Sequence, residues 1–432
     1  MRIKLALTAY RLILPLLFIT AFPGWLVKML RRGGMGTHLG ERVTVYTTPL
    51  EYELCHAVHI HAVSVGETLL ALKLIREWRL SEPLRDFVLA TGTATGHAVA
   101  TSAKILRLRV TYAPLDLSPM VNRYLNRFEP EQVILIEGEV WPHLLLACHA
   151  RHIPVRVVNA RVSPRSARRF TRFANWLRPI YSLLEGVTLQ EAADAEIWQT
   201  LGVDHQKIHL TGSLKFDPGS GEHPKRRPDF QKILDHFGKE RLVILAASTH
   251  AGEDAFIAQA AHEAAPQALI ILVPRHAERR VEVAASLEKA GFVVKLRSSS
   301  ETLVSVVNER CVFVVDSTGE LSDWTAHADV VIIGKSFLSS GGQNPCEAIL
   351  AEKPIITGAH MENFQPLTNR LVAAGACIVA ADSSALSQAI RTALDPKRAE
   401  QMTRQATSTL AMHHGATRRI LQFLQHQNSA TF

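Results

Sequence analysis

The sequence predicts an α/β fold made of two Rossmann-like, doubly wound domains. Its 432 residues are more than one hydrophobic core usually serves. Short continuous apolar runs alternate with amphipathic segments, which is typical of a parallel sheet covered by helices on both faces. The alternation stops at the polar, basic stretch from Pro218 to Arg227 and then starts again. This stretch is therefore the expected linker.

The expected elements follow from these runs in chain order. Strands are predicted before the linker at Val58–Ala62, Phe87–Thr91, Gln132–Glu137, Val155–Asn159 and Val187–Gln190. Amphipathic periodicity indicates helices at Leu69–Leu80, Ser118–Phe128 and Leu144–Arg151. After the linker, strands are predicted at Leu242–Ala247, Ala268–Val273, Phe292–Leu296, Val312–Asp316, Val330–Ile333, Pro354–Ile356 and Cys377–Ala380, and a helix from Pro396 to about Gln427.

The expected organisation is an N-terminal segment over residues 1–30, a first domain over 31–217 and a second domain over 218–432. Ligands of doubly wound sheets bind outside the carboxyl ends of the strands. We therefore expect the functional site in a cleft between the two domains.

The amino-acid composition indicates which binding partners to expect. A hydrophobic content of 47% with 20% charged residues indicates a folded protein, and the net charge of +8 favours anionic partners such as phospholipids, nucleotides or phosphorylated substrates. Aromatic residues make up 6%, and neither a zinc-finger spacing nor an RNA-binding motif is present, so nucleic acid is not expected. The five scattered cysteines argue against a disulfide framework and for a reducing compartment.

The N-terminal segment has a membrane-like pattern. The run from Leu12 to Val27 carries no charge and has basic residues on both sides. It is shorter than the ~20 apolar residues of a full span, and its prolines weaken a straight helix. A short or tilted anchor, an interfacial helix and a cleavable signal peptide are the alternatives. The flanking charges favour the anchor, with the body in the cytoplasm.

Several motifs in the first half place polar groups where a parallel sheet binds ligands. Glu41, in a Gly-Glu-Arg motif, is either a general base or a surface Glu paired with a neighbouring Arg. Ser64, Gly66 and Glu67 follow the first strand and suit either an anionic group at a helix start or simple N-capping.

The strand ending at Glu137 leads to a second cluster. Glu137 and Glu139 stand beside Trp141 and Pro142, and paired carboxylates can divide acid and base roles. The structural alternative is a packed Trp with one capping Glu. Arg161, after the next strand, suits an anion or an acidic partner.

Strand ends in the second half carry phosphate-binding chemistry. Gly341 and Gly342 allow close backbone approach, and Asn344 suits a helix start one turn before Glu347, which could accept hydrogen bonds from a sugar diol. The other candidates follow three further strands or lie at the domain junction: Ser248, Arg275, His276, Gly319, Glu320, Leu321 and Lys215. No metal-binding motif or nucleophile elbow is present, so a metal-independent reaction without a cofactor is expected.

Together these blocks resemble the 3-deoxy-D-manno-octulosonic acid (Kdo) transferases of lipopolysaccharide synthesis. The resemblance runs from the N-terminal segment to the C-terminus and is carried by motifs at Gly40–Arg42, His61–Thr68, Glu137–Pro142, Asn159–Ser163, Thr211–Asp217, Ala247–His250, Leu272–His276, Asp316–Leu321, Gly341–Glu347 and Asn363–Phe364.

The resemblance implies a GT-B fold and transfer of Kdo from CMP-Kdo to a lipid A precursor at the cytoplasmic face of the inner membrane. By family position, Glu41 would be the general base, and Ser64, Gly66 and Glu139 would line the acceptor side. Arg275, the loop Gly319–Leu321, Asn344 and Glu347 would hold CMP-Kdo. The sequence departs from the family pattern at Gln343, where His is usual, and also at Gly138, Ala251, Thr318 and Lys335.

Overall fold

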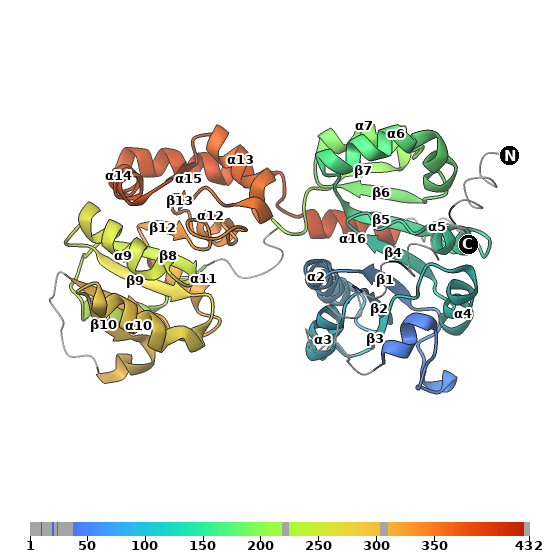
Figure 1. Cartoon of the computed structure of the whole chain (residues 1–432), viewed down its shortest axis with the longest axis horizontal. Helices are drawn as coiled ribbons and strands as arrows, with labels where there is room; N and C mark the ends of the chain where they lie inside the picture. The colour runs from blue at the N-terminus through green and yellow to red at the C-terminus, as the bar shows by residue number, and fades with distance from the viewer. Residues whose placement is uncertain are drawn as a thin grey trace. The chain divides into compact units, whose positions relative to one another are not determined.

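The computed structural model describes residues 38–217, 224–302 and 310–426, together with Tyr10, Thr20 and Gly24. The chain forms two compact units (Figure 1). The first unit comprises Met1–Gly219 and His413–Phe432, and the second comprises Ser220–Met412.

A seven-stranded sheet forms the centre of the first unit, and all of its strand pairs are parallel. The strand order is β3-β2-β1-β4-β5-β6-β7. The strands are β1 (Val58–Ala62), β2 (Phe87–Thr91), β3 (Leu108–Tyr112), β4 (Gln132–Ile136), β5 (Val155–Ala160), β6 (Gly186–Leu189) and β7 (Ile208–Leu210). Its helices are α2 (Val65–Ser81), α3 (Ala94–Ser102), α4 (Ser118–Phe128), α5 (Pro142–His149), α6 (Pro164–Tyr181), α7 (Ala195–Thr200) and α16 (Ala416–His426), with short 3-10 turns at Leu39–Val43, Leu50–Tyr52, Ala192–Asp194 and His205–Lys207.

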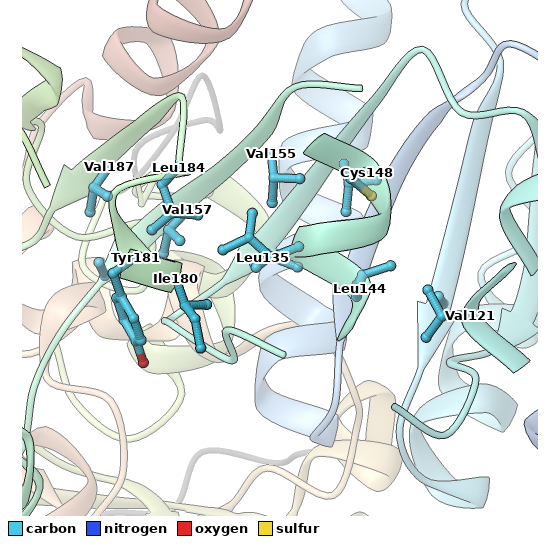
Figure 2. Packing of buried hydrophobic residues seen from close by; sticks show 14 of the residues in the cluster. Val121, Leu135, Leu144, Cys148, Val155, Val157, Ile180, Tyr181, Leu184 and Val187 are labelled. Carbon is cyan, nitrogen blue, oxygen red and sulfur yellow. The ribbon is translucent and has the colours of Figure 1, made fainter. Parts of the chain in front are cut away.

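Apolar side chains on both faces bury this sheet, because successive residues of a strand point to opposite sides. On one face, Val58 and Ile60 of β1 join Trp78 of α2 in a common core. The other face packs against α4, α5 and the end of α6, and Figure 2 shows this second core.

The second unit repeats the architecture with another seven-stranded sheet, in the order β10-β11-β9-β8-β12-β13-β14 and parallel throughout. Its strands are β8 (Val243–Thr249), β9 (Leu269–Pro274), β10 (Val293–Leu296), β11 (Cys311–Val314), β12 (Val330–Ile333), β13 (Ile355–Thr357) and β14 (Cys377–Val379). The helices are α8 (Pro228–Asp235), α9 (Glu253–Ala264), α10 (Arg280–Lys289), α11 (Leu321–His327), α12 (Cys346–Leu350), α13 (Gln365–Ala373), α14 (Ser383–Leu394) and α15 (Pro396–Ala411), with 3-10 turns at Ala277–Arg279, Arg297–Thr302 and Glu362–Phe364.

The C-terminal helical segment differs from the expectation in two ways. The single helix expected from Pro396 to about Gln427 is interrupted after Ala411, and Gly415 adopts a φ of 75° before α16 begins. The expected second domain included this end of the chain, whereas its contacts assign His413–Phe432 to the first unit. The reason is hydrophobic, because Ile420 and Leu424 of α16 lie in the core with Trp78 of α2.

Each predicted strand is present within one or two residues of its expected ends, but β3 and β7 were not predicted. All five cysteines are unpaired, and Cys55 alone of them is exposed. The predicted anchor, residues 1–30, lies outside the described residues, apart from Tyr10, Thr20 and Gly24. Within the described part of the chain, no helix has the length and apolar character needed to cross a membrane.

Candidate functional site

In each sheet, the candidate residues gather where the strand order changes direction. The first sheet reverses between β1 and β4, and the second between β8 and β12. Connections leave the two central strands toward opposite edges, which opens a crevice at their carboxyl ends. Ser64–Glu67 and Glu137–Glu139 follow β1 and β4, while Ser248 ends β8 and Gly341–Glu347 follow β12.

Ser64 and Glu67 form a reciprocal cap at the start of α2. The Glu67 backbone N donates to Ser64 Oγ at 3.2 Å, and Ser64 Oγ donates to Glu67 Oε1 at 2.8 Å. Val63 N donates to Glu67 Oε2 at 2.8 Å. Both side chains therefore perform the N-capping that was the structural alternative, while Gly66 is exposed beside them.

Glu137 is the centre of a charged cluster in the first unit. Burial raises the pKa of the Glu137 carboxyl, the positive charges of Arg161 and Lys215 lower it, and Glu139 raises it further. The pKa of Glu67 is also raised, first by burial and further by the charges of Glu137 and Glu139. The structure thus brings together five charged candidates from the sequence, namely Glu67, Glu137, Glu139, Arg161 and Lys215.

Hydrogen bonds with Asn159 and Lys73 hold the loop that carries Lys215. Asn159, at the end of β5, accepts a hydrogen bond from Leu214 N at 2.8 Å through Oδ1, with its own φ at 57°. The Lys73 ammonium donates to the carbonyl oxygens of Leu214 and Asp217. Lys215 is expected on the donor side, yet its electrostatic partner in the first unit is Glu137.

Glu41 lies apart from this cluster, against the edge strand β3, and is 1% exposed. Arg109 Nη2 donates to Glu41 Oε1 at 2.8 Å, and Thr111 Oγ1 donates to Oε2 at 2.7 Å. Tyr112 N donates to the same oxygen at 3.1 Å. The carboxylate is therefore a buried acceptor with partners on both oxygens.

Sequence reasoning missed the partners of Glu41. Arg109 also donates through Nε to Glu53 Oε2 at 3.0 Å, and Arg127 Nη2 lies 2.7 Å from Glu53 Oε1. The sequence around Glu53 and Arg127 contains no recognisable motif. The chain of ion pairs from Glu41 through Arg109 and Glu53 to Arg127 forms only when η2 (Leu50–Tyr52), β3 and α4 pack together.

In the second unit, five of the predicted donor-side residues surround one small cavity. Its volume is about 60 Å³, which is enough for part of a nucleotide rather than the whole. The lining comes from the end of β8, the residue after β9, β12, α11, and the loop before α12 together with α12 itself. Predicted residues in the lining are Ser248, Arg275, Leu321, Asn344 and Glu347.

Glu347 and Arg275 are the charged pair of this cavity. Burial raises the pKa of the Glu347 carboxyl, and the charge of Arg275 offsets part of the rise. Glu347 Oε2 is buried and has no hydrogen-bond partner among the described residues. Arg275 is exposed at the rim. Glu347 Oε2 therefore lacks a hydrogen-bond donor from the described residues at this cavity, and the nearby Arg275 guanidinium can bind an anionic group such as a phosphate.

Besides Lys215, three predicted donor-side residues lie outside this lining. The Glu320 carboxylate accepts hydrogen bonds from Arg297, Ser317 and Trp324, so its side chain is already engaged by the protein. Gly319 has a φ of 85° with open space beside it. His276 is exposed, and its ring centroid lies 6.2 Å from that of His250.

The glycine-rich loop before α12 is held in an unusual backbone conformation. Gly341 and Gly342 have φ values of 122° and 66°. Gly341 N donates to Glu362 Oε2 at 2.6 Å. Glu253, which is fully buried and which sequence reasoning missed, accepts hydrogen bonds from the backbone N–H groups of His250, Lys335 and Phe337.

Gln343 occupies the family's usual His position. Its Nε2 lies 3.1 Å from His250 Nε2. Lys335, at a usual Gly position, has a φ of 55°, so it keeps a backbone conformation that favours glycine. Among the described residues, no group of three or more His, Cys, Asp or Glu is placed to hold a metal ion.

Comparison with known proteins identifies relatives along most of the chain. The family described as 3-Deoxy-D-manno-octulosonic-acid transferase (kdotransferase) matches residues 37–218. The 3-deoxy-D-manno-octulosonic acid transferase of Bordetella pertussis is 36% identical over 86% of this chain and 87% of its own length. The enzyme of that name from Haemophilus influenzae is 32% identical over 85% and 86%.

Solved structures agree with the fold. A glycosyltransferase from Rickettsia africae superposes with a TM-score of 0.52 at 11% identity, covering 85% of this chain and 99% of its own. The two parallel-sheet α/β units thus resemble those of GT-B glycosyltransferases. Given the identity and coverage of its curated relatives, the chain belongs to the 3-deoxy-D-manno-octulosonic acid transferase family.

Proposed function

We propose that this protein transfers Kdo from CMP-Kdo to a lipid A precursor in lipopolysaccharide synthesis. Two findings that agree with each other support the proposal. Relatives named for this activity align over 85% and 86% of the chain, and four donor-side residues expected from the family line one cavity together with Ser248.

The second unit is the proposed donor site. Glu347 would accept hydrogen bonds from the ribose hydroxyls, which would satisfy its unpartnered Oε2. Arg275 would hold the phosphate, together with backbone N–H groups of the loop Gly319–Leu321. Ser248, Asn344 and His276 would complete the contacts. Lys215 would add positive charge from the first unit.

The first unit is the proposed acceptor site. Carboxylates accept hydrogen bonds from sugar hydroxyls, a role we assign to Glu137 and Glu139. Arg161 is exposed and would pair with a phosphate of the acceptor. The capped start of α2 would form one wall of this acceptor site, through Ser64, Gly66 and Glu67.

Glu41 is the proposed general base. The acceptor hydroxyl oxygen would attack the anomeric carbon of Kdo while Glu41 takes its proton, and the bond to the CMP phosphate would break. Arg275 would stabilise the charge on the departing phosphate. Here Glu41 Oε2 accepts two hydrogen bonds and Oε1 accepts one, so the hydroxyl would donate to Oε1, which keeps a free lone pair.

We propose the inner membrane as the location, with the catalytic domains on its cytoplasmic face and residues 1–30 as the anchor. Support comes from the basic residues on both sides of Leu12–Val27 and from the lipid nature of the acceptor.

The test is incubation of the full chain with CMP-Kdo and lipid IVA, followed by mass spectrometry for added Kdo. The Glu347→Gln and Arg275→Gln variants should lose transfer. Absence of product where a known Kdo transferase works would refute the proposal. The alternative is another GT-B glycosyltransferase with a different nucleotide sugar, and it predicts thermal stabilisation by UDP or GDP rather than CMP.

A further inference from the structure

Helix α6 is a basic helix without a single acidic residue. Its sequence, PRSARRFTRFANWLRPIY, carries arginines at positions 165, 168, 169, 172 and 178. Some exposed arginines elsewhere in the protein pair with acids, as Arg404 does with Glu400 at 2.5 Å. Among the described residues, no acid forms an ion pair with an arginine of α6. The helix therefore presents uncompensated positive charge.

The two faces of α6 have different partners. Phe170 and Leu177 pack against the core of the first unit, and Ile180 and Tyr181 belong to it (Figure 2). The opposite face is solvent-exposed and combines charge with aromatic surface. Phe173 is 50% exposed and Trp176 is 46% exposed. The exposed basic residues of this face are Arg165, Arg168, Arg169 and Arg172.

The spacing brings these groups together. Arg169 and Phe173, and likewise Arg172 and Trp176, stand four residues apart and share a stripe of the helix. The Arg172 guanidinium carbon lies 5.7 Å from the centre of the Phe173 ring. Cations and aromatic rings arranged in this way suit the boundary between lipid headgroups and acyl chains, where the cations meet phosphates and the rings enter the apolar edge.

The position of α6 in the fold points to the same partner. The helix begins at Pro164, three residues after Arg161 of the proposed acceptor cluster. A lipid acceptor has to reach that cluster from a bilayer, so a membrane-binding surface next to it shortens the path.

We propose that the face of α6 formed by Arg165, Arg168, Arg169, Arg172, Phe173 and Trp176 binds an anionic phospholipid surface. This contact is separate from the expected anchor in residues 1–30. Only the argument from position rests on the proposed function, because the charge and exposure of α6 do not depend on the reaction.

The first experiment follows Trp176 in the full-length chain. The emission of wild type minus that of Trp176→Phe isolates this indole from the other tryptophans. Vesicles of phosphatidylglycerol and phosphatidylcholine should shift the difference spectrum to the blue, and brominated acyl chains should quench it. If the chain sediments with the vesicles while the Trp176 signal is unchanged, only other segments bind and the proposal is wrong.

The second experiment removes charge. The Arg169→Gln/Arg172→Gln variant should bind phosphatidylglycerol vesicles at least tenfold more weakly, since each basic residue near such a surface contributes about fivefold. Lys397→Gln/Arg404→Gln on α15 makes the same change in charge and should bind like wild type. Equal losses in the two variants would overturn the proposal, as would tight binding of a DNA oligonucleotide with no response to vesicles.

These measurements use no substrate, so their failure is distinguishable from failure of Kdo transfer. If the charge variant remains folded by circular dichroism and transfers Kdo in detergent micelles but not on phosphatidylglycerol vesicles, the defect lies in surface binding rather than in the reaction.

Discussion

Arg109 joins two buried acids, with its Nη2 2.8 Å from Glu41 Oε1 and its Nε 3.0 Å from Glu53 Oε2. One cation thus holds the proposed base and a second carboxylate whose side chain is fully buried. Removing one partner from such a network leaves the others with an unbalanced charge. The position of Glu41 is therefore tied to the stability of the first unit as well as to the proposed chemistry.

The first prediction concerns Glu41→Gln. The amide keeps the size of the side chain but loses the charge that faces Arg109, so we expect the free energy of unfolding to fall by about 2–3 kcal/mol. Urea denaturation measures this change. The double variant Glu41→Gln/Arg109→Met should lose less than the sum of the single variants, because the two residues interact directly.

The same variant tests the proposed base. Where Glu41→Gln remains folded, Kdo transfer should fall by about 10²–10⁴-fold, the usual contribution of a general base. Thr111→Val, which removes one hydrogen bond to the carboxylate, should retain most of the activity. A folded Glu41→Gln protein with normal turnover would show that the base lies elsewhere, and Glu137 would become the next candidate.

The second prediction uses the raised pKa of Glu347. Its folded pKa exceeds the unfolded value of about 4.3, so the folded state binds the proton more tightly. The resulting stability is fully present below the unfolded pKa and is lost as the pH rises through the folded pKa. Glu347→Gln should therefore be more stable than wild type at neutral pH, and the difference should shrink near pH 4.

Thermal unfolding between about pH 4 and pH 8 in the absence of nucleotide measures this effect. Glu352→Gln is the control, because Glu352 is exposed in the same part of the second unit. Glu347→Gln should also lose stabilisation by CMP. A parallel pH dependence in wild type and Glu347→Gln would show that Glu347 is not the source.

The positions of the candidate residues at strand ends could be predicted from the sequence because their signals are local. Apolar runs located β4, β8 and β12, the run Val58–Ala62 located β1, and parallel topology then placed the residues after these strands at common sheet edges. The cap formed by Ser64 and Glu67 is likewise local, since the two residues stand three apart. Such features need no knowledge of the assembled fold.

The environment of Glu41 could not be predicted in this way. Its partner Arg109 lies 68 residues further along the chain, on β3, a strand that was not predicted. The environment of Glu320 could not be predicted either, because its carboxylate accepts a hydrogen bond from Arg297, 23 residues earlier in the chain. In both cases, long-range ion pairs determine what the side chain does.

The third prediction separates two reasons why a position requires glycine, a positive φ and a lack of space for a Cβ atom. A Cβ at Gly342 would lie 2.4 Å from Met361 Sδ and 3.0 Å from the His360 carbonyl oxygen, whereas one at Gly319 would meet nothing within 4 Å. Both residues have a positive φ. Gly319→Ala should therefore cost only the backbone term of about 1–2 kcal/mol, while Gly342→Ala should cost more than this.

Denaturant unfolding of the two variants provides the comparison. The Gly342→Ala protein should also bind CMP more weakly, because the loop it distorts leads into α12 and Glu347. Equal losses of stability would mean that Met361 moves aside without cost and that packing at Gly342 is loose.

The last prediction concerns the unit to which α16 belongs. Leu424 is fully buried with residues of the first unit, and Asp217 accepts hydrogen bonds from Gly415 N at 2.9 Å and Thr417 N at 2.7 Å at the start of the helix. Leu424→Ala should therefore destabilise the first unit by about 2–5 kcal/mol. Arg418→Ala, on the exposed side of α16, should have little effect. Native-state hydrogen exchange distinguishes the units, because protection should fall in α2 and stay unchanged in α9. Loss of protection in α9 with α2 unaffected would instead place the helix with the second domain, as the sequence alone suggests.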